Sequence, residues 1–110
     1  MTDSIVIKAV EKLVEEIKKS DIYIEYDCQR DKLKKQPELF ERVKEFRQRN
    51  FELQNSEQGD DLFEKIDAFE KEYEKFREIP LVEDFLSAEL AFCRMMQDVN
   101  MQITAELDFE

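Results

Sequence analysis

The sequence predicts an all-α protein of about five helices, with a central antiparallel helical hairpin and a long C-terminal helix. Its apolar residues recur at intervals of three and four, which is the period of an amphipathic helix. The chain also holds a single Gly and only two Pro, too few for the turns that sheets require. At 110 residues it has the length of one domain, so we expect residues 1–110 to form a single helical domain.

The first helix is expected from about Asp3 to Lys19, with Thr2 or Asp3 as its cap. It carries an apolar stripe with helical spacing, made of Val6, Val10, Leu13 and Ile17 and flanked by Ile7 and Val14.

A second helix follows, with Ser20 or Asp21 as its cap. Its inward side chains are predicted to be Ile22, Tyr26 and Leu33. The helix should end before Pro37, because the residue ahead of a proline is pushed out of helical geometry. Pro37 itself fits the first turn of the next helix.

The central hairpin is predicted from two stripes with the same spacing. They consist of Leu39, Val43, Phe46, Asn50 and Leu53, and of Leu62, Ile66, Phe69, Tyr73 and Phe76. A turn at Ser56–Asp60, which contains Gly59, would bring them together in antiparallel register. The expected pairs are Leu53 with Leu62, Asn50 with Ile66, Phe46 with Phe69, Val43 with Tyr73, and Leu39 with Phe76.

Asn50 is the one polar residue in these two stripes. A polar residue in such a seam can fix the register or the oligomeric state at a cost in stability. The alternative is that Asn50 lies at the rim, and the sequence leaves both interpretations open.

The last helix is expected to open at Pro80 and to run from about Leu81 to Leu107. Its first part is apolar nearly all round, whereas its second part keeps only Val99, Ile103 and Leu107. A helix that is apolar on every side must be covered on every side. Four neighbouring helices could provide this cover, but for so small a chain a second copy is an economical alternative, so we expect a homodimer or higher oligomer.

The net charge of −11 is unevenly distributed. Residues 1–56 hold 12 acidic and 12 basic side chains, so residues 57–110 carry the whole excess. We expect no direct binding to nucleic acid, since phosphates are bound by Lys and Arg. The excess of acidic side chains either keeps the protein soluble or forms a surface for a basic partner; the sequence leaves both interpretations open. No apolar run approaches the length of a membrane span, and no signal peptide is visible, so no membrane insertion and a cytoplasmic location are expected.

The residue types of enzymes are largely missing. The chain has no His, its four Ser lie outside any nucleophile motif, and one Gly cannot form a phosphate-binding loop. Paired carboxylates such as Glu11 with Glu15 are typical of solvated helix faces. We therefore predict no enzymatic activity, no cofactor and no metal site. Of the two cysteines, Cys93 is expected to be a small buried residue among Phe92, Met95 and Met96, and Cys28 a free thiol.

The last helix resembles a known signature. The stretch Ile79-Pro80-Leu81-Val82-Glu83-Asp84-Phe85-Leu86-Ser87-Ala88-Glu89, followed by Met96, Val99 and Ile103, is similar to that of the YlbF/YmcA regulator family. Gln36-Pro37-Glu38-Leu39 resembles the family's helix opening, and Phe46 to Gln54 its Phe, Arg and Gln-rich helix. Tyr23 and Tyr26 look like the aromatic pair that precedes it. The resemblance runs from about Ile5 to Leu107.

The resemblance implies a helical, oligomeric protein without enzymatic activity. Some family members join complexes that influence competence, sporulation and biofilm formation, and act as specificity factors for an endoribonuclease that matures mRNA, whereas others have no assigned role. The best-studied members also bind iron–sulfur clusters through cysteines, partly near the C-terminus. This chain has no cysteine after Cys93, so cluster binding is not carried over.

Our first hypothesis is a regulatory adaptor that binds itself, other family members or an endoribonuclease complex. Its predicted contact surface is the apolar first half of the last helix, with Val82, Phe85, Leu86, Phe92 and Met96. The same residues could instead form the core of the monomer or only a homodimer interface. The second hypothesis is an iron–sulfur or redox-sensing protein that uses Cys28 and Cys93 across a dimer. A third alternative is a self-assembling helical protein of unknown role.

Overall fold

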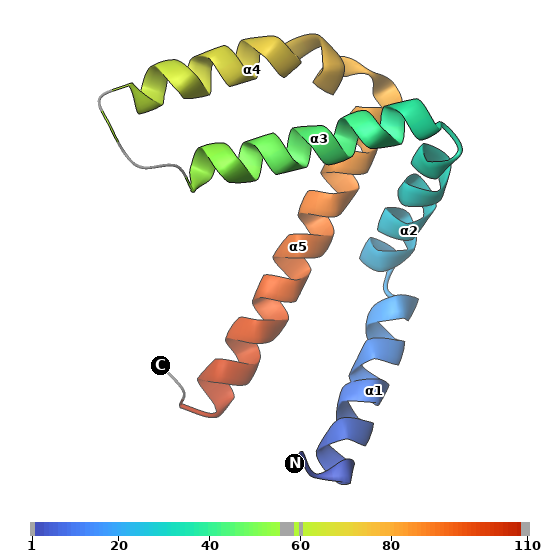
Figure 1. The fold of residues 1–110 in the computed structure, drawn as a ribbon. Helices are drawn as coiled ribbons and strands as arrows, with labels where there is room; N and C mark the ends of the chain where they lie inside the picture. Colours follow the sequence, from blue (N-terminus) through green and yellow to red (C-terminus); the bar gives the residue numbers. More distant parts are fainter. Residues whose placement is uncertain (1, 56–58, 60, 109–110) are drawn as a thin grey trace. The chain divides into compact units, whose positions relative to one another are not determined.

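Five α-helices follow one another in the computed structural model, which describes residues 2–55, 59 and 61–108 (Figure 1). They are α1 (Ser4–Lys19), α2 (Asp21–Lys34), α3 (Pro37–Gln54), α4 (Leu62–Glu78) and α5 (Pro80–Glu106). No strand occurs among these described residues. The predicted fold class, the number of helices and the long C-terminal helix are thus confirmed.

Short polar side chains define the first helix boundaries. Asp3 caps α1, because its Oδ1 accepts a hydrogen bond from the backbone N–H of Ile5 at 2.8 Å. Ser20 separates α1 from α2: its hydroxyl donates to the carbonyl of Ile17 at 2.6 Å and accepts from the N–H of Tyr23 at 3.2 Å. One side chain therefore serves the end of one helix and the start of the next.

The two prolines begin helices, as predicted. Pro37 is the first residue of α3 and Pro80 the first residue of α5, where the missing N–H has no cost. The predicted turn between α3 and α4 falls on residues 56–60, which lie outside the described residues apart from Gly59.

The chain divides into two compact units by its internal packing. One unit comprises Met1–Gln29 with Ser87–Glu110, and the other comprises Arg30–Leu86. The helices α2 and α5 each run from one unit into the other, and we describe each unit by itself. The expectation of a single domain stays a prediction.

In the unit of Arg30–Leu86, α3 and α4 lie side by side and antiparallel (Figure 1). Phe46 of α3 stacks on Phe69 of α4 with ring centroids 5.4 Å apart, as the predicted register requires. The Phe46 ring also meets Tyr73 edge-on at 5.0 Å and Phe76 at 6.0 Å. Aromatic pairs in these geometries add to the stabilisation from burial alone.

The core of this unit draws on four helices. Its buried apolar side chains are Leu33 of α2, Val43 of α3, Phe69, Tyr73 and Phe76 of α4, and Val82 and Phe85 of α5. The predicted inward positions of Leu33 and of the hairpin stripes are confirmed at these residues. Cations cover the edge of the core, since Arg42 lies 4.6 Å from the Phe76 ring centroid and Arg47 lies 5.8 Å from that of Phe85.

Asn50 is half-buried on α3. Its Oδ1 accepts a long hydrogen bond of 3.5 Å from Nε2 of Gln54, one turn further along the same helix. A bond within one helix does not select the register between two helices. The placement therefore favours the rim interpretation, and the register role stays a prediction.

In the other unit, an aromatic cluster joins α2 to α5. The Phe92 ring stacks on Tyr26 with centroids 4.9 Å apart and meets Tyr23 edge-on at 5.4 Å. The prediction that Ile22 faces inward is wrong, because this side chain is exposed. Tyr23 and Tyr26, rather than Ile22, are the side chains of α2 whose rings contact Phe92.

Candidate protein interface

The five predicted contact residues on α5 divide into two groups. Val82 and Phe85 are fully buried in the core of the unit of Arg30–Leu86. A side chain buried within its own chain cannot meet a partner while this packing persists, so these two placements favour the core interpretation. Leu86, Phe92 and Met96 are half-buried. A contact role for any of the five stays a prediction.

Phe92 already has neighbours within the chain, namely the rings of Tyr23 and Tyr26. Met96 lies one turn further along α5 and keeps part of its surface open. Met96 is thus a predicted contact residue whose apolar side chain is partly accessible. Methionine also adapts well to a partner's surface.

The middle of α5 is not covered on every side by its own chain. Leu90 is half exposed, and Ala91 is exposed as well. A helix segment that is apolar all round is expected to be covered on every side. Within the described residues, that cover is incomplete.

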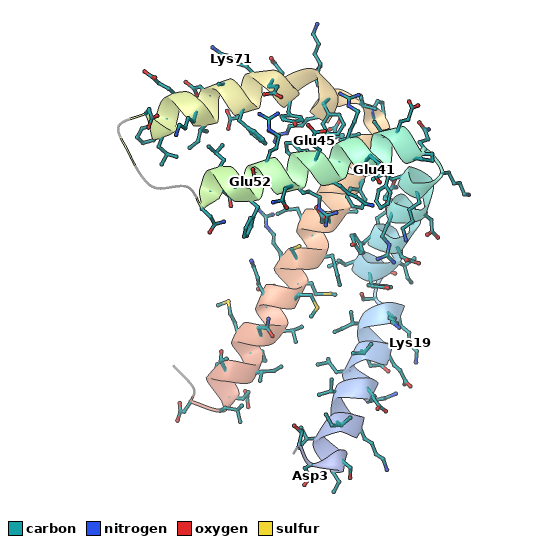
Figure 2. The ribbon with its side chains drawn as sticks, in the orientation of Figure 1. Asp3, Lys19, Glu41, Glu45, Glu52 and Lys71 are labelled. Carbon is teal, nitrogen blue, oxygen red and sulfur yellow. The ribbon has the colours of Figure 1, made fainter. Side chains whose placement is uncertain are left out.

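A row of exposed apolar side chains lies on α1, which buries none of its residues. Asp3 and Lys19 mark its two ends in Figure 2. Between them, six exposed apolar side chains follow the helix: Ile5, Val6, Ile7, Val10, Leu13 and Val14. Ile17 at the end of the stripe is half-buried. Contiguous apolar surface of this kind marks interaction sites more often than isolated exposed residues do.

Sequence reasoning found this stripe but did not identify it as a contact surface. The stripe has the spacing of a buried face, and a single sequence does not tell whether such a face packs inside the chain or outside it. The available signal was the sharp separation of apolar from charged residues around α1, together with its near-neutral charge in an acidic chain.

The charged side chains of α1 pair among themselves. Lys12 Nζ lies 3.1 Å from a carboxylate oxygen of Glu16 and 3.8 Å from one of Glu15, and Lys19 Nζ lies 3.7 Å from the same Glu16 oxygen. These exposed pairs add only a little stability. Glu16 is the charged residue nearest to the apolar stripe. Because its carboxylate is paired with Lys12 and Lys19, it does not place an unpaired charge beside the stripe.

Two further aromatic side chains are exposed in the unit of Arg30–Leu86. Phe63 on α4 is 79% exposed, and Phe51 on α3 is 63% exposed. They lie on different helices, and single exposed apolar residues are normal on protein surfaces. Neither defines an interface by itself.

Both cysteines are exposed and free. The expectation that Cys93 is buried is wrong: Phe92 turns its ring toward Tyr23 and Tyr26, and the next residue on a helix points about 100° away from that direction. Among the residues that the structure describes, no group of three or more His, Cys, Asp and Glu could hold a metal ion.

A shallow hollow between α3 and α4 is lined by Arg49, Glu52, Leu53, Lys65, Ala68, Phe69 and Glu72. Small-molecule sites are typically concave and lined mainly by apolar and aromatic groups. A lining dominated by exposed charges does not match that chemistry. No helix in the described part of the chain has the length and apolar character to cross a membrane.

Comparisons with known proteins give the same family that the sequence resembles. A family model described as "Control of competence regulator ComK, YlbF/YmcA" matches residues 6–108. No curated protein and no solved structure matches the chain. The family match spans all five helices of the structure apart from the first two residues of α1. The chain therefore belongs to the YlbF/YmcA family, a family of regulators linked to the control of competence.

Proposed function

We propose that this protein is a non-enzymatic regulatory adaptor, which acts by binding other proteins and further copies of itself. The single observation that carries the proposal is the exposed apolar stripe of α1, a helix with no buried residue. Leaving such a stripe in water is unfavourable, so a stable cellular form covers it. Binding to a protein is the simplest cover for a helix face.

The chemistry of the chain supports a binding role over a catalytic one. With no His in the sequence, the commonest general base is missing. The pKa of one carboxyl group, that of Glu72, is displaced from its ordinary value, and the cause is an exposed ion pair with Arg49. Displaced pKa values at active sites usually arise from burial in a cleft together with a specific charge partner, which is a different setting.

Membership of the YlbF/YmcA family supports a regulatory role, since the family is described by its control of a competence regulator. The partners that we propose are other members of this family and an endoribonuclease complex acting in mRNA processing. Competence, sporulation and biofilm formation are the processes that such complexes would influence. We propose a cytoplasmic location for the protein.

The test is an affinity purification of the tagged protein from its native host, read by mass spectrometry. The native chain is compared with Met96→Asp, which adds a charge to the predicted contact surface, and with Met101→Asp as matched control. Met101 lies on the same helix and is exposed, outside the predicted surface. We expect the native chain and Met101→Asp to recover an endoribonuclease or other family members, and Met96→Asp to lose them.

The variant Phe92→Asp tests in parallel whether Phe92 belongs to the core of the monomer or to an interface. Helix content from circular dichroism and molar mass from light scattering are measured for each variant. Loss of helix content by Phe92→Asp assigns this residue to internal packing with Tyr23 and Tyr26. A native chain that recovers only itself would contradict the adaptor role and leave a self-assembling protein.

A cluster- or redox-sensing role is the alternative, favoured by one observation: both thiols are exposed and thus accessible. Two thiolates cannot complete a four-cysteine site, but two chains together supply four. Purification without oxygen tests this alternative. A preparation with the visible absorbance of an iron–sulfur cluster, lost in Cys28→Ser, would replace the adaptor proposal, and a colourless one counts against the alternative.

A further inference from the structure

Two exposed aromatic side chains lie at the end of the central hairpin where α3 stops and α4 starts. Phe63, near the start of α4, is 79% exposed, and Phe51, near the end of α3, is 63% exposed. The two helices run side by side in opposite directions (Figure 1). The register that Phe46 and Phe69 define therefore sets the two exposed rings at nearly the same level of the hairpin.

The same two rings also share one face of the hairpin. On the other face, Arg49 of α3 pairs with Glu72 of α4. Each of these two residues directly precedes a residue of the apolar stripes along which the helices meet, whereas Phe51 and Phe63 directly follow such residues. Successive residues of an α-helix are 100° apart, so the positions before and after a stripe lie on opposite sides of it. Phe51 and Phe63 therefore lie together, opposite the ion pair.

An acidic row continues from Phe63 along the same side of α4. Asp67, Glu70 and Glu74 also directly follow stripe residues, so they are aligned with Phe63 along the helix. All three carboxylates are exposed. None of them makes a side-chain hydrogen bond or an ion pair within the described residues, so the row presents negative charge to solvent.

Two basic side chains of α4 lie near this row. Lys71 and Arg77 line a shallow hollow on α4 together with the three carboxylates. Lys71, however, lies on the side of α4 that faces away from α3 (Figure 2). Arg77 places its guanidinium 5.9 Å from the ring centroid of Phe46, at the edge of the core. Neither cation is paired with a carboxylate of the row.

Two basic side chains of α3, Lys44 and Arg47, directly follow stripe residues and so lie on the same face. Lys44 is paired with Glu41 of its own helix at 3.2 Å. Arg47 lies 5.8 Å from the ring centroid of Phe85. Because both cations have partners of their own, the acidic row of α4 keeps its charge for a further partner.

Five exposed side chains thus define a surface that we call the hairpin face: Phe51, Phe63, Asp67, Glu70 and Glu74. We propose that the hairpin face is a docking surface for a helix of another protein, one that carries apolar side chains followed by a row of Lys or Arg. This proposal rests on the adaptor role proposed above and adds to it a surface and the chemistry of the partner.

Charge decides the class of partner that fits the hairpin face. Carboxylates repel phosphate groups, which makes nucleic acids and anionic lipid surfaces poor occupants. A basic protein segment has the complementary charge, which speeds encounter and fixes orientation. The whole chain has a net charge of −11, so it attracts a basic segment from a distance and repels a second copy of itself.

The spacing of the hairpin face favours a helix as the occupant. From Phe63, the acidic row advances by four, three and four residues, and a helix packed alongside presents its own side chains at the same intervals. Aromatic side chains are enriched in the buried centres of interfaces. The apolar side chains of the partner would therefore cover Phe51 and Phe63, and its basic side chains would lie over the row.

The first experiment titrates the full chain with a synthetic helical peptide, read by fluorescence anisotropy. The probe carries a stripe of Leu side chains that is followed on the same side by Lys side chains. A second peptide has the same pattern with Glu in place of Lys. We expect the Lys peptide to bind at least about tenfold more tightly than the Glu peptide, and added salt to weaken its binding.

A variant of the apolar part locates the bound peptide. Phe63→Ala should weaken binding of the Lys peptide at least about fivefold, because the ring no longer contributes apolar area to the contact. Met101→Ala is the matched control, since Met101 is 67% exposed on α5, outside the hairpin face. It should bind as the native chain does. Unchanged binding by Phe63→Ala, with loss of binding by Val10→Asp, would place the peptide on α1 and overturn the proposal.

A variant of the acidic row separates local from overall charge. It combines three substitutions: Asp67→Asn, Glu70→Gln and Glu74→Gln. The control removes three charges from α1 instead: Glu11→Gln, Glu15→Gln and Glu16→Gln. We expect the first to weaken binding at least about fivefold and to reduce its salt dependence, and the control to change binding less than about twofold. Equal effects would mean that the peptide responds only to net charge and would overturn the surface.

The affinity purification separates the hairpin face from the adaptor role. We expect Phe63→Asp to lose a partner that the native chain and Met101→Asp both recover. If Phe63→Asp retains every partner, the surface is wrong and the adaptor role stands. If the native chain recovers only itself, the adaptor role is wrong, and the peptide titration alone decides whether the face binds a basic helix.

Two further measurements complete the test. Light scattering compares the molar mass of Phe63→Asp with that of the native chain, and a lower mass would mean that a second copy covers the hairpin face, which contradicts a different protein as its occupant. Urea denaturation shows whether the variant remains folded. We expect native stability, because Phe63 is 79% exposed and its substitution leaves no cavity.

Discussion

Arg49 of α3 and Glu72 of α4 form a two-pronged ion pair that ties the two helices of the central hairpin together. Nη2 of Arg49 donates to Oε1 of Glu72 at 3.0 Å, and Nη1 donates to the other carboxylate oxygen. Nη1 also donates to the hydroxyl of Tyr73 at 3.0 Å. The guanidinium therefore links the aromatic core of the hairpin to its polar edge, in the geometry that Arg and carboxylates prefer.

The first prediction concerns the pH dependence of this pair. The hydrogen bonds from Arg49 lower the pKa of Glu72 below its ordinary value of 4.5. Because the pKa is lower in the folded chain, the pair stabilises the fold in full above the ordinary pKa, and this contribution disappears as pH falls through the lowered value. Thermal melts should show Glu72→Gln less stable than the native chain near neutral pH, with the difference vanishing in acid.

The control for this experiment is Glu70→Gln, because Glu70 is an exposed carboxyl on the same helix that makes no side-chain hydrogen bond or ion pair within the described residues. Its melting temperature should follow that of the native chain across the same pH range. The pair is solvent-exposed, so added salt should shrink the effect of Glu72→Gln. An effect that grows as the pH falls would contradict the assignment.

The second prediction concerns the Phe46 ring, which contacts Phe69, Tyr73 and Phe76. Phe46→Ala should lower the free energy of unfolding by about 2 to 3 kcal/mol, since it leaves a cavity and removes three aromatic contacts. Phe51→Ala on the same helix is the matched control, because that ring is 63% exposed; its effect should stay within about 0.5 kcal/mol. Urea denaturation measures both, and equal losses would refute the described core.

The third prediction concerns the aromatic junction of α2 with α5. Phe92→Leu keeps an apolar side chain but removes the stacked contact with Tyr26 and the edge contact with Tyr23. The near-ultraviolet circular dichroism of the two tyrosines should therefore weaken, and stability should fall by about 1 kcal/mol. Leu90→Ala, at a half-exposed position two residues away, should leave the tyrosine signal intact. An unchanged signal in Phe92→Leu would show that the junction does not order these rings.

The fourth prediction concerns Gln29, a polar side chain that is only 7% exposed. Its Nε2 donates to Oε1 of Glu25 at 2.7 Å, whereas its own Oε1 has no hydrogen-bond partner in the described structure. Burying an unsatisfied polar atom costs about 1 to 3 kcal/mol, so Gln29→Met should leave stability unchanged or raise it by about 1 kcal/mol. Glu25→Met serves as control, because it removes the same hydrogen bond but keeps the buried amide of Gln29. A marked destabilisation by Gln29→Met would mean that the amide is fully satisfied.

The helices and their boundaries could be predicted because local signals define them. Asp3 and Ser20 hydrogen-bond to free backbone groups at the helix ends, and Pro37 and Pro80 begin the helices that follow them. These are effects of neighbouring residues, which a single sequence contains in full. The hairpin register was also predictable at Phe46 and Phe69, since two stripes of equal spacing pair along their length in one way.

Which apolar helix faces are buried and which are exposed could not be predicted in the same way. Val82 and Phe85 are buried, whereas Val10 and Val14 with the same chemistry are exposed. Burial depends on which helices meet in space, and neither periodicity nor composition contains that information. Ile22 and Cys93 were misplaced for the same reason, because the contact between α2 and α5 is made by the aromatic residues next to them, Tyr23 and Phe92.

The position of Ser20 between two helices has a consequence for the dynamics of α1. This helix has 16 residues, little more than the ~12–15 below which an isolated helix is marginal in water. At its two ends, the side chains of Asp3 and Ser20 hydrogen-bond to backbone groups of the helix, and none of its residues is buried. Its backbone amides should therefore exchange with deuterium sooner than those of α3 and α4, and their protection should grow with protein concentration as copies associate.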